Sequence, residues 1–574
     1  MTRGNQKRHH PRCTTALQST AFWLQELALV RWTASQLPAI VPVRSYPLAG
    51  SKGCRRCGAS TFPFAMQLRL FRHFVPVSVV LLASSDALLI TGAFYQLLSA
   101  SETGVPIILR VSSFTAQFSA GLAVAAVTAM VSIGLYGHQS FVDFRLLLNK
   151  IAVAFLLVLM LVLFAAIYWR DGLSYLPDPR SFPLKATLIW LVCVSVTRGT
   201  FSVTLGRGLL KRRVLVLGNG GQAARIAKLV ETGENEHFVP ISFIGMPGER
   251  SSLRSDMVDR SVLDPDALTD DALTEMVYRL GASEIVVATD DRRGLPVRQL
   301  LHSKLAGIKV IDFLDFWERE TRTVDLEALK PSWLFYSDGF RCGPLEELLK
   351  RAFDVTVSLG LLLLTLPLLV ITACLIKLES PGPILYHQAR VGLHGREFTI
   401  LKFRSMRADA ETDGGPRWAS EGDPRVTRVG AIIRKLRIDE LAQIFNVLRG
   451  DMSLIGPRPE RPFFVAELTR AVPYYSERHW VRPGITGWAQ VNYPYGASTE
   501  DAWIKLTYDL YYVKNRSIFL DLMILLQTAR VIFWNYGARE GAEPGYRRNT
   551  NGLCGVRARV HPGNRINDNA GSDQ

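Results

Sequence analysis

A set of two or more cysteine pairs, which would indicate a disulfide framework or a zinc ribbon, is missing from this sequence. The seven cysteines are scattered, and the close pair Cys54 and Cys57 has no second pair nearby. Acidic residues are scarce in the first 65 residues, where nine lysines and arginines accompany a single acid, Glu26. A motif for DNA or RNA binding is also missing, so the net charge of +16 is not assigned to nucleic acid. Most other basic residues flank apolar runs, which is typical of a protein held against anionic lipid.

Long apolar runs are abundant: the hydrophobic fraction is 48% and the mean hydropathy is +0.13. Four runs, near 74–98, 114–136, 150–169 and 186–206, have roughly the 20 residues that a helix needs to cross a bilayer. Basic residues precede the first run, separate the second from the third and follow the fourth, which places both ends in the cytoplasm. We therefore expect four transmembrane helices within 66–210. Asp86 and Arg198 lie inside these runs, and we interpret them as interfacial or bundle-facing residues rather than as a transport pathway.

The two ends of the chain have a different character. Residues 1–65 show no helical period, and Met66 begins a short basic stretch before the first apolar run. We hypothesise that the native chain starts at Met66 and that 1–65 is a disordered or non-native extension; a targeting segment is the alternative. Residues 538–574 are rich in glycine, asparagine and arginine, which predicts a disordered tail.

Strands and helices alternate in residues 211–320, which predicts a Rossmann-like parallel α/β domain. Its first strand runs into a GxGxxA sequence that contains Gly218, Gly220 and Ala223, a pattern that lets the backbone approach a pyrophosphate. The acid expected after the second strand, which would bind a ribose, is replaced by Met246 and Pro247. This domain could bind a nucleotide, or it could have a purely structural or regulatory role. We favour the second interpretation. Residues 321–343 are interpreted as a linker.

A fifth apolar run covers residues 353–378 and has Pro367 near its middle. Proline removes a backbone donor and clashes with the preceding turn, so the helix should bend there. Both flanks of the run are basic. A full crossing would put everything after it outside the cell, so we favour a re-entrant helix-break-helix over a plain fifth span.

Short polar signatures crowd the chain from residue 379 onward. They include Gln388-Ala389-Arg390-Val391-Gly392, Leu401-Lys402-Phe403-Arg404, Arg434-Lys435-Leu436-Arg437-Ile438-Asp439-Glu440, Gly456-Pro457-Arg458-Pro459-Glu460 and Arg482-Pro483-Gly484-Ile485-Thr486-Gly487-Trp488-Ala489-Gln490-Val491-Asn492. Five basic side chains could clamp phosphates: Arg390, Lys402, Arg404, Arg434 and Arg458. Asp439 and Glu440 are adjacent in a stretch, 436–448, that we expect to be helical. Their side chains should point about 100° apart, so one can attack phosphorus while the other holds a metal.

These motifs resemble the bacterial sugar transferase family, the polyprenyl-phosphate hexose-1-phosphate transferases. The resemblance covers about 344–536, and the front half looks like the large members of the family. The stretch 491–497 is similar to the subgroup associated with exosortase-linked exopolysaccharide clusters. A departure is Leu366, where some relatives have serine before the helix-breaking proline that Pro367 would match.

The resemblance implies an activity and roles for the site residues. Asp439 would be the nucleophile that takes a hexose 1-phosphate from a UDP-sugar and releases UMP, and Glu440 would bind Mg²⁺. Undecaprenyl phosphate would then accept the phosphosugar in the first membrane step of exopolysaccharide synthesis. The protein would be a multi-pass protein of the bacterial inner membrane with its catalytic domain in the cytoplasm. Its partners would be the lipid bilayer and other exopolysaccharide assembly proteins, and a homodimer is reasonable.

The expected fold is thus a membrane protein with three parts: a four-helix transmembrane bundle, a Rossmann-like cytoplasmic domain, and a mainly α monotopic catalytic domain over 344–537 with a re-entrant helix. Two other functions were weighed. A membrane-anchored nucleotide-sugar dehydratase or epimerase would need a Tyr-x-x-x-Lys pair, and that spacing does not occur in the chain. A non-enzymatic polysaccharide-assembly scaffold would not need the Asp439–Glu440 pair with its basic residues. The sequence does not name the sugar.

Overall fold

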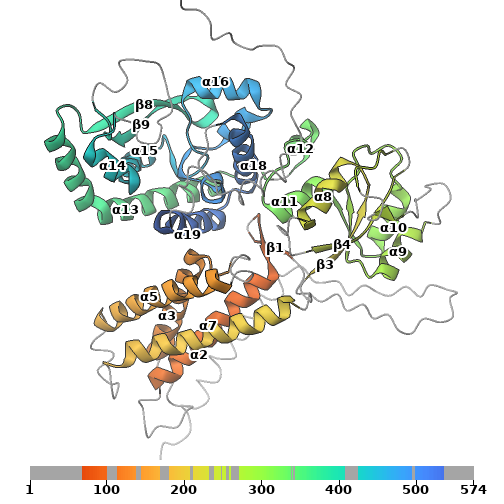
Figure 1. Cartoon of the computed structure of the whole chain (residues 1–574), viewed down its shortest axis with the longest axis horizontal. Coiled ribbons are helices and arrows are strands. Elements are labelled where there is room, and N and C mark those ends of the chain that lie inside the picture. The colour runs from red at the N-terminus through yellow and green to blue at the C-terminus, as the bar shows by residue number, and fades with distance from the viewer. Residues whose placement is uncertain are drawn as a thin grey trace, which may run out of the picture. The chain divides into compact units, whose positions relative to one another are not determined.

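The structure is a computed structural model that describes residues 67–70, 72–99, 113–136, 144–168, 180–206, 211–231, 238–246, 249–253, 258–259, 270–337, 339–340, 343–407, 425–493 and 498–534. The predictions for residues 1–65, for a start at Met66 and for 538–574 concern residues outside these ranges. In the ranges that are described, helices predominate and the strands form one large sheet and three small ones (Figure 1).

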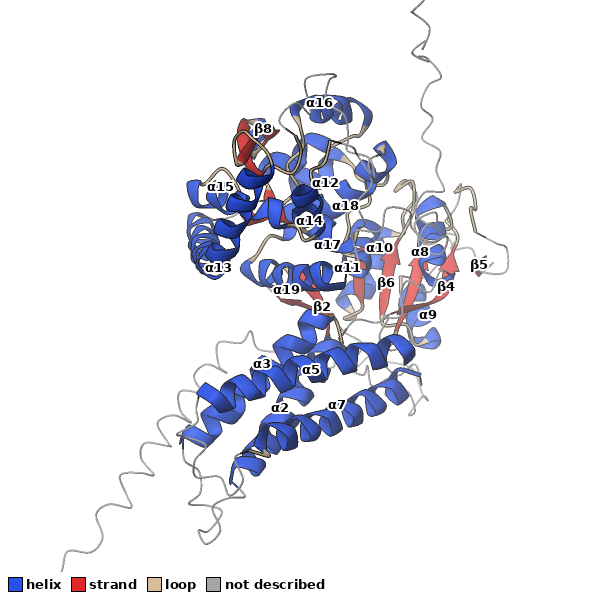
Figure 2. Cartoon of the chain, turned by 60° about the vertical axis from the view of Figure 1, so that its left-hand side comes forward, coloured by secondary structure: helices blue, strands red, loops and turns tan. Residues whose placement is uncertain are grey.

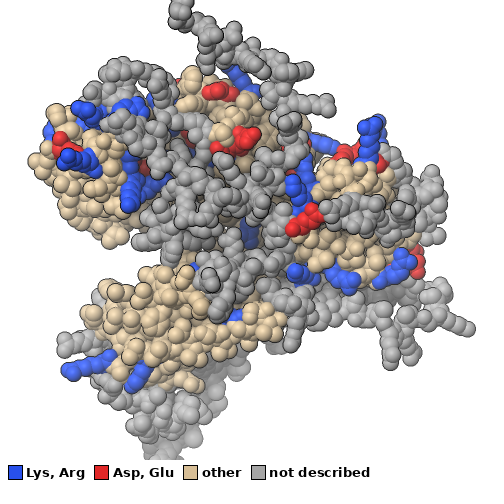
Figure 3. Space-filling view, viewed as in Figure 1, with Lys and Arg blue, Asp and Glu red and all other residues tan. Residues whose placement is uncertain are grey.

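Four long apolar helices follow the start of the described chain: α2 (Val77–Ser99), α3 (Ser113–Ile133), α5 (Phe144–Tyr168) and α7 (Phe182–Gly206). Each is long and apolar enough to cross a membrane, and they share one core that includes Ile90, Met130, Val158 and Trp190. Many large apolar side chains point outward instead, and the surface over these helices carries few charges in Figure 3. Such a surface is stable against lipid rather than water. The protein is therefore a membrane protein.

The two charged residues inside the apolar runs face the interior of this helix group, as we expected. Arg198 donates a hydrogen bond to Asp86 over 3.0 Å, and the Tyr136 hydroxyl donates to the same carboxylate over 2.7 Å. Both charged side chains are almost fully buried. The pair neutralises its own charge, which lets it join α2 to α7 within an apolar environment.

A short antiparallel hairpin precedes α2. Its strands are β1 (Gln67–Leu70) and β2 (His73–Pro76). His73 is buried, and its Nδ1 lies 2.9 Å from the hydroxyl of Tyr511, 438 residues further along the chain. The hairpin thus connects the first apolar helix with the C-terminal part of the protein.

A five-stranded parallel sheet forms the next part, in the order β5-β4-β3-β6-β7. The strands are β3 (Arg212–Leu217), β4 (Phe238–Ile244), β5 (Val258–Asp259), β6 (Glu284–Val287) and β7 (Lys309–Asp312). Helices α8 (Gly221–Glu231) and α11 (Phe313–Thr321) share a core with one face, and α9 (Ala272–Leu280) and α10 (Val297–Leu305) with the other (Figure 2). This strand order is that of a doubly wound nucleotide-binding fold. The alternation of strands and helices expected over 211–320 is found in the structure, because buried parallel strands read as continuous apolar runs.

Residues 321–343, which we interpreted as a linker, contain structure that packs into the C-terminal domain. Helix α12 (Pro331–Tyr336) lies here, and Val324, Leu326 and Leu329 belong to the main core of that domain. The backbone amide of Val324 also donates to the carbonyl of Thr507. The apolar residues are too few and too irregularly spaced to show a helical or strand period, so their burial could not be predicted from periodicity.

Helix α13 (Pro344–Glu379) is assigned as one helix of 36 residues with Pro367 inside it. Figure 1 shows its ribbon changing direction along its length. The two parts pack on different cores: Phe353, Val357 and Leu361 on the main core of the C-terminal domain, and Leu369 and Ile376 on a smaller one. A proline within a helix removes one backbone hydrogen bond and bends the axis, which supplies the physical cause.

The remaining elements build the C-terminal domain. They are β8 (Leu385–Val391), η3 (Leu393–Gly395), β9 (Glu397–Phe403), α14 (Arg428–Lys435), η4 (Ile438–Gln443), α15 (Ile444–Arg449), β10 (Ser453–Ile455), α16 (Pro462–Ala471), η5 (Tyr475–Trp480), β11 (Gly484–Thr486), α17 (Trp488–Asn492), α18 (Thr499–Asn515) and α19 (Ile518–Trp534). β8 and β9 form an antiparallel hairpin, and β10 pairs in parallel with β11. Most of the domain is helical, as expected.

Candidate active site

The Asp439–Glu440 pair lies where two helices are joined at an angle, not inside one helix over 436–448 as we predicted. α14 ends at Lys435, and Arg437 adopts a left-handed conformation with φ of 59°. The 3₁₀ helix η4 then begins and carries both acids in its first turn, before α15 starts at Ile444. Periodicity alone misses this break, because a single left-handed residue leaves the apolar spacing almost unchanged. With three residues per 3₁₀ turn, the two side chains diverge by about 120°.

Glu440 is the centre of a cluster of cations. Arg458 donates to its Oε1 over 2.9 Å, the Lys402 ammonium lies 3.4 Å from the same oxygen, and Arg437 lies 4.0 Å away. The Glu440 side chain is only 13% exposed. Burial raises the pKa of Glu440, but Arg458, Lys402 and Arg437 outweigh burial and hold that pKa far below its ordinary value. Glu440 is therefore a permanent anion.

Asp439 has the opposite electrostatic environment. Burial and, after it, the charge of Glu440 raise the pKa of Asp439 above its ordinary value, although Lys402 and Arg434 oppose this. Its Oδ1 is buried and has no hydrogen-bond partner among the described residues. A buried carboxylate oxygen without a partner is costly and usually has a functional reason. The more basic carboxylate is also the better nucleophile.

Three of the five predicted phosphate-binding residues come together at this pair. Lys402 on β9 and Arg458, in the loop between β10 and α16, contact Glu440, and the charge of Arg434 in the last turn of α14 acts on Asp439. Burial is the main cause that lowers the pKa of Lys402. The three cations converge from separate parts of the chain, which gives a site for a polyanion.

Arg390 and Arg404 have other contacts. Arg390 donates to the carbonyl of Pro459 over 3.0 Å and to Gln388 over 2.7 Å, and so supports the loop that carries Arg458. Arg404 is buried and donates to the backbone carbonyls of Ser380 and Pro381, where it holds the turn after α13. The charge of Arg390 nevertheless reaches the cluster, since it adds to burial in lowering the pKa of Lys402.

Several residues that we did not predict shape the site. Arg437 contacts Glu440, and its place three residues before that acid could have indicated it. Asn446 is fully buried: it accepts from the backbone amide of Leu401 over 2.9 Å and donates to the carbonyl of Thr399 over 2.8 Å. It therefore fixes β9 just before Lys402, at Thr399 and Leu401. No sequence signal marked Asn446, because an asparagine in a helix is usually exposed.

The carboxylate pair fits a magnesium ion. No cluster of three or more histidine, cysteine, aspartate or glutamate side chains occurs among the residues that the structure describes. Mg²⁺ does not require one, since it commonly binds through one or two carboxylates together with substrate phosphates and water. Glu440, with the unpaired Oδ1 of Asp439 beside it, offers such a donor set.

The glycine-rich loop of the parallel-sheet domain is occupied by the protein's own carboxylates. Asp290, which follows β6, accepts hydrogen bonds from the amides of Gly221 and Gln222 over 2.7 and 3.0 Å. Glu249 accepts from the amides of Asn219 and Asp290 over 3.0 and 2.9 Å. These amides are the donors that would hold a pyrophosphate in such a loop.

The predicted glycines of this loop serve close packing. A Cβ on Gly220 would overlap the carboxylate of Asp290, and Gly218 adopts φ of 128° with the carbonyl of Ala288 against it. Ala223 is buried in the core beneath the loop. The GxGxxA pattern is explained by packing without a nucleotide.

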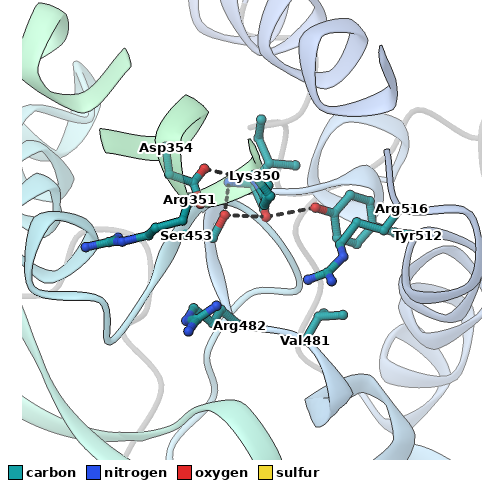
Figure 4. A pocket seen from close by; sticks show the side chains of 9 residues that line it. Lys350, Arg351, Asp354, Ser453, Val481, Arg482, Tyr512 and Arg516 are labelled. Atoms are coloured by element: carbon teal, nitrogen blue, oxygen red, sulfur yellow. Dashed lines mark hydrogen bonds and ion pairs between the residues drawn. The ribbon is translucent and has the colours of Figure 1, made fainter. Parts of the chain in front are cut away.

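A pocket in the C-terminal domain lies apart from the pair and its cation cluster (Figure 4). Its charged lining residues are Lys350, Arg351 and Asp354 of α13, together with Arg482 and Arg516. Lys350 lies 2.9 Å from both Asp354 and Asp521. Arg482 donates to the carbonyl of Gly450 and to Glu347. Arg516 shares Glu347 with Arg482, and Arg351 donates to the carbonyls of Val447 and Leu448. Because these side chains bond within the protein, we interpret the pocket as part of the domain's structure.

Comparison with known proteins identifies relatives of the domain that contains this pair. The family model described as bacterial sugar transferase matches residues 345–535. A UDP-N-acetylgalactosamine-undecaprenyl-phosphate N-acetylgalactosaminephosphotransferase of Aeromonas hydrophila is 47% identical over 250 residues, which are 44% of this chain and 58% of that protein. An undecaprenyl-phosphate glucose phosphotransferase of Komagataeibacter xylinus is 33% identical over 398 residues, 67% of this chain and 72% of the relative. An exopolysaccharide production protein of Rhizobium leguminosarum bv. phaseoli is 43% identical over 189 residues, 32% of this chain and 94% of the relative.

Proposed function

Since the chain belongs to the bacterial sugar transferase family, we propose that it transfers a sugar 1-phosphate from a UDP-sugar to undecaprenyl phosphate and releases UMP. The observation that carries the proposal is the buried, unpaired Oδ1 of Asp439 beside the cation-bound Glu440. A transfer between two phosphates needs a nucleophile and positive charge around the phosphates, and the site supplies both.

The reaction proceeds in two displacements at one phosphorus. Asp439 attacks the β-phosphorus of the UDP-sugar, and the bond from that phosphorus to the bridging oxygen breaks, so that UMP leaves and an aspartyl-phosphosugar remains. An oxygen of undecaprenyl phosphate then attacks the same phosphorus, and the acyl-phosphate bond breaks to restore the Asp439 carboxylate. The product is an undecaprenyl diphosphate sugar.

The basic residues stabilise the negative charge that shifts to UMP and to the transferred phosphoryl group. Lys402 and Arg458 already contact Glu440, and the charge of Arg434 acts on Asp439, so little reorganisation is needed when substrate arrives. Magnesium held by Glu440 would neutralise diphosphate charge and assist departure of UMP.

The reaction would take place at the cytoplasmic face of the bacterial inner membrane. α13 enters and leaves the bilayer on the same side as a re-entrant helix, which keeps the site with the cytoplasmic UDP-sugar. The name of the Rhizobium relative supports a role in exopolysaccharide production. Within it we place this chain at the first membrane step, with other assembly proteins downstream. The relatives' names include both glucose and N-acetylgalactosamine, so either class of UDP-sugar is a candidate donor.

The test is UMP release by the full chain in membranes that contain undecaprenyl phosphate, over a panel of UDP-hexoses and UDP-N-acetylhexosamines. We expect Asp439→Asn to abolish UMP release, because the amide cannot form the intermediate. Glu467→Gln, which also changes a carboxylate to an amide but at an exposed position of the domain, should keep it.

A donor labelled with ³²P at the β-phosphate tests the covalent step. Without acceptor, the wild-type protein should retain the label in denaturing gels, and Asp439→Asn should not. Unimpaired UMP release by Asp439→Asn would refute the mechanism, and release without labelling of the wild type would indicate direct transfer between the substrates.

A further inference from the structure

The loop that carries Arg458 connects β10 to α16 and is held at its start by backbone packing. The amide of Gly456 donates to the carbonyl of Thr486 over 2.9 Å, and a Cβ on Gly456 would overlap the carbonyl of Arg482. The position of the Arg458 guanidinium at Glu440 depends on this loop, because a long side chain has little rigidity of its own.

Arg478 on η5 binds the backbone of this loop at Arg458. Its Nη2 donates to the backbone carbonyl of Arg458 over 3.0 Å, and its Nη1 donates to the hydroxyl of Tyr475 over 2.8 Å. Its Nε donates to Asp509 of α18 over 3.0 Å, and Nη2 lies 2.8 Å from the same carboxylate oxygen. The three partners lie on different elements, and the planar fork of a guanidinium can reach all three together.

Both members of this ion pair are buried, Arg478 with 5% and Asp509 with 2% of their surface exposed. A buried guanidinium destabilises a protein unless a carboxylate and further acceptors satisfy it. Stability alone does not explain such an arrangement, since apolar residues of similar size often stabilise equally well. What the pair adds is a fixed geometry at the carbonyl of a site residue.

We propose that Arg478, fixed by Asp509, is a positioning residue that holds the backbone of Arg458 and so places the Arg458 guanidinium at Glu440. This rests on the proposed function, in which Arg458 acts on the substrate phosphates. Arg478 itself touches neither substrate nor the acidic pair; it acts through Arg458.

The test is a double-mutant cycle on the full chain, read as kcat and KM for the UDP-sugar in UMP release. Arg458→Ala and Arg478→Lys should each lower kcat/KM by at least about tenfold, with the loss divided between kcat and KM in the same way. The double variant should lie within about threefold of Arg458→Ala, because positioning has no effect once the positioned side chain is gone.

Arg482→Lys is the matched control. Arg482 also donates to a backbone carbonyl, that of Gly450, and to a carboxylate, Glu347, but outside the cation cluster. If Arg482→Lys lowers kcat/KM, its fold-loss and that of Arg458→Ala should multiply in the variant that carries both changes. If Arg478→Lys fails to fold, Asp509→Asn loosens the same guanidinium with little change in volume.

Two results would overturn the proposal. In the first, Arg478→Lys has the same kcat/KM as the wild type. In the second, the fold-losses of kcat/KM from Arg478→Lys and Arg458→Ala multiply in the double variant, as expected for Arg482→Lys. If the wild type releases no UMP from any donor, the proposed function fails instead. The same cycle, measured as calorimetric affinity for UDP with Mg²⁺, then decides the positioning role.

Discussion

Asn446 illustrates at the scale of one residue how the site depends on groups that never meet substrate. Its amide satisfies two backbone groups of β9, which belong to Thr399 and Leu401 and come just before Lys402 along the chain. Asn446→Ala would leave the amide of Leu401 and the carbonyl of Thr399 buried without this partner. Each lost partner costs about 1–3 kcal/mol.

We therefore expect Asn446→Ala to lower the free energy of unfolding of the C-terminal domain by about 2 kcal/mol or more and to raise KM for the UDP-sugar. Denaturant unfolding and UMP release of the full chain measure the two effects. Ser476→Ala removes a hydroxyl that bonds to the adjacent Glu477 at an exposed position and is the control. Equal unfolding curves for Asn446→Ala and Ser476→Ala would contradict the expectation.

At this scale the sequence indicated the chemistry but not the direction of each side chain. The acidic pair and three of the five predicted cations, Lys402, Arg434 and Arg458, meet in the structure. Arg390 and Arg404 have the same charge and lie in similar motifs, yet they bond to backbone carbonyls. Which way a guanidinium points depends on tertiary packing, and residue type and spacing do not encode it.

At the scale of elements, the path of α13 through the membrane decides on which side the C-terminal domain lies. Its 36 residues exceed the roughly 20 that cross a bilayer, and Pro367 lies within its apolar part. Without the proline the helix should straighten and could reach the opposite face.

We expect Pro367→Ala to move part of the molecules to a topology in which α13 spans the membrane. A cysteine introduced at the exposed position Glu467 would then react with a membrane-impermeant reagent from outside the cell. The same cysteine in the chain that keeps Pro367 should react only after the cells are opened. Identical labelling of both chains would argue against a re-entrant helix that depends on this proline.

The glycine-rich loop gives a second prediction for an element. Asp290 and Glu249 occupy the amides that a nucleotide pyrophosphate would need, and Met246 and Pro247 stand after β4 where the acid that binds a ribose is expected. A dinucleotide would have to displace both carboxylates, and their negative charge would repel its pyrophosphate.

Calorimetry of the full chain with NAD⁺ should accordingly show no saturable binding up to millimolar concentration. An Asp290→Asn variant combined with Glu249→Gln tests whether removal of the charge opens the loop to phosphate. Saturable binding of NAD⁺ to the wild type would overturn this interpretation.

The sequence predicted the parallel sheet and the loop correctly, but not the carboxylates that occupy the loop. Glu249 lies 30 residues from Asn219, whose amide it binds, and Asp290 lies 68 residues from Gln222, whose amide it binds. Contacts over such distances along the chain cannot be predicted from a local motif.

At the scale of the whole molecule, the catalytic part has relatives that consist of little else. The Rhizobium relative matches over 94% of its own length but over only 32% of this chain. The family model likewise begins at residue 345. In this protein, however, residues before that point belong to the same core, among them Val324, Leu326 and Leu329.

A buried ion pair continues this connection into α11. Lys514 at the end of α18 lies 2.6 Å from Glu318, and Asn515 donates to the other oxygen of that carboxylate over 2.6 Å. Both side chains of the ion pair are about 5% exposed or less. Removing one partner of a buried pair leaves an uncompensated charge and costs about 3–5 kcal/mol, whereas replacing both partners with apolar groups can be nearly neutral.

Glu318→Gln should therefore lower the thermal stability of the full chain, because the Lys514 ammonium stays buried without its counter-charge. Combining Glu318→Gln with Lys514→Met should restore much of the loss, since the methionine is apolar and can still pack on the nearby ring of Trp333. Thermal unfolding of the wild type, the two single variants and the double variant measures this directly. If the double variant is less stable than Glu318→Gln, the pair does not join α11 to the catalytic domain through its charges. If it recovers, the front part of the chain stabilises the catalytic domain through a contact that the shorter relatives must replace by other means.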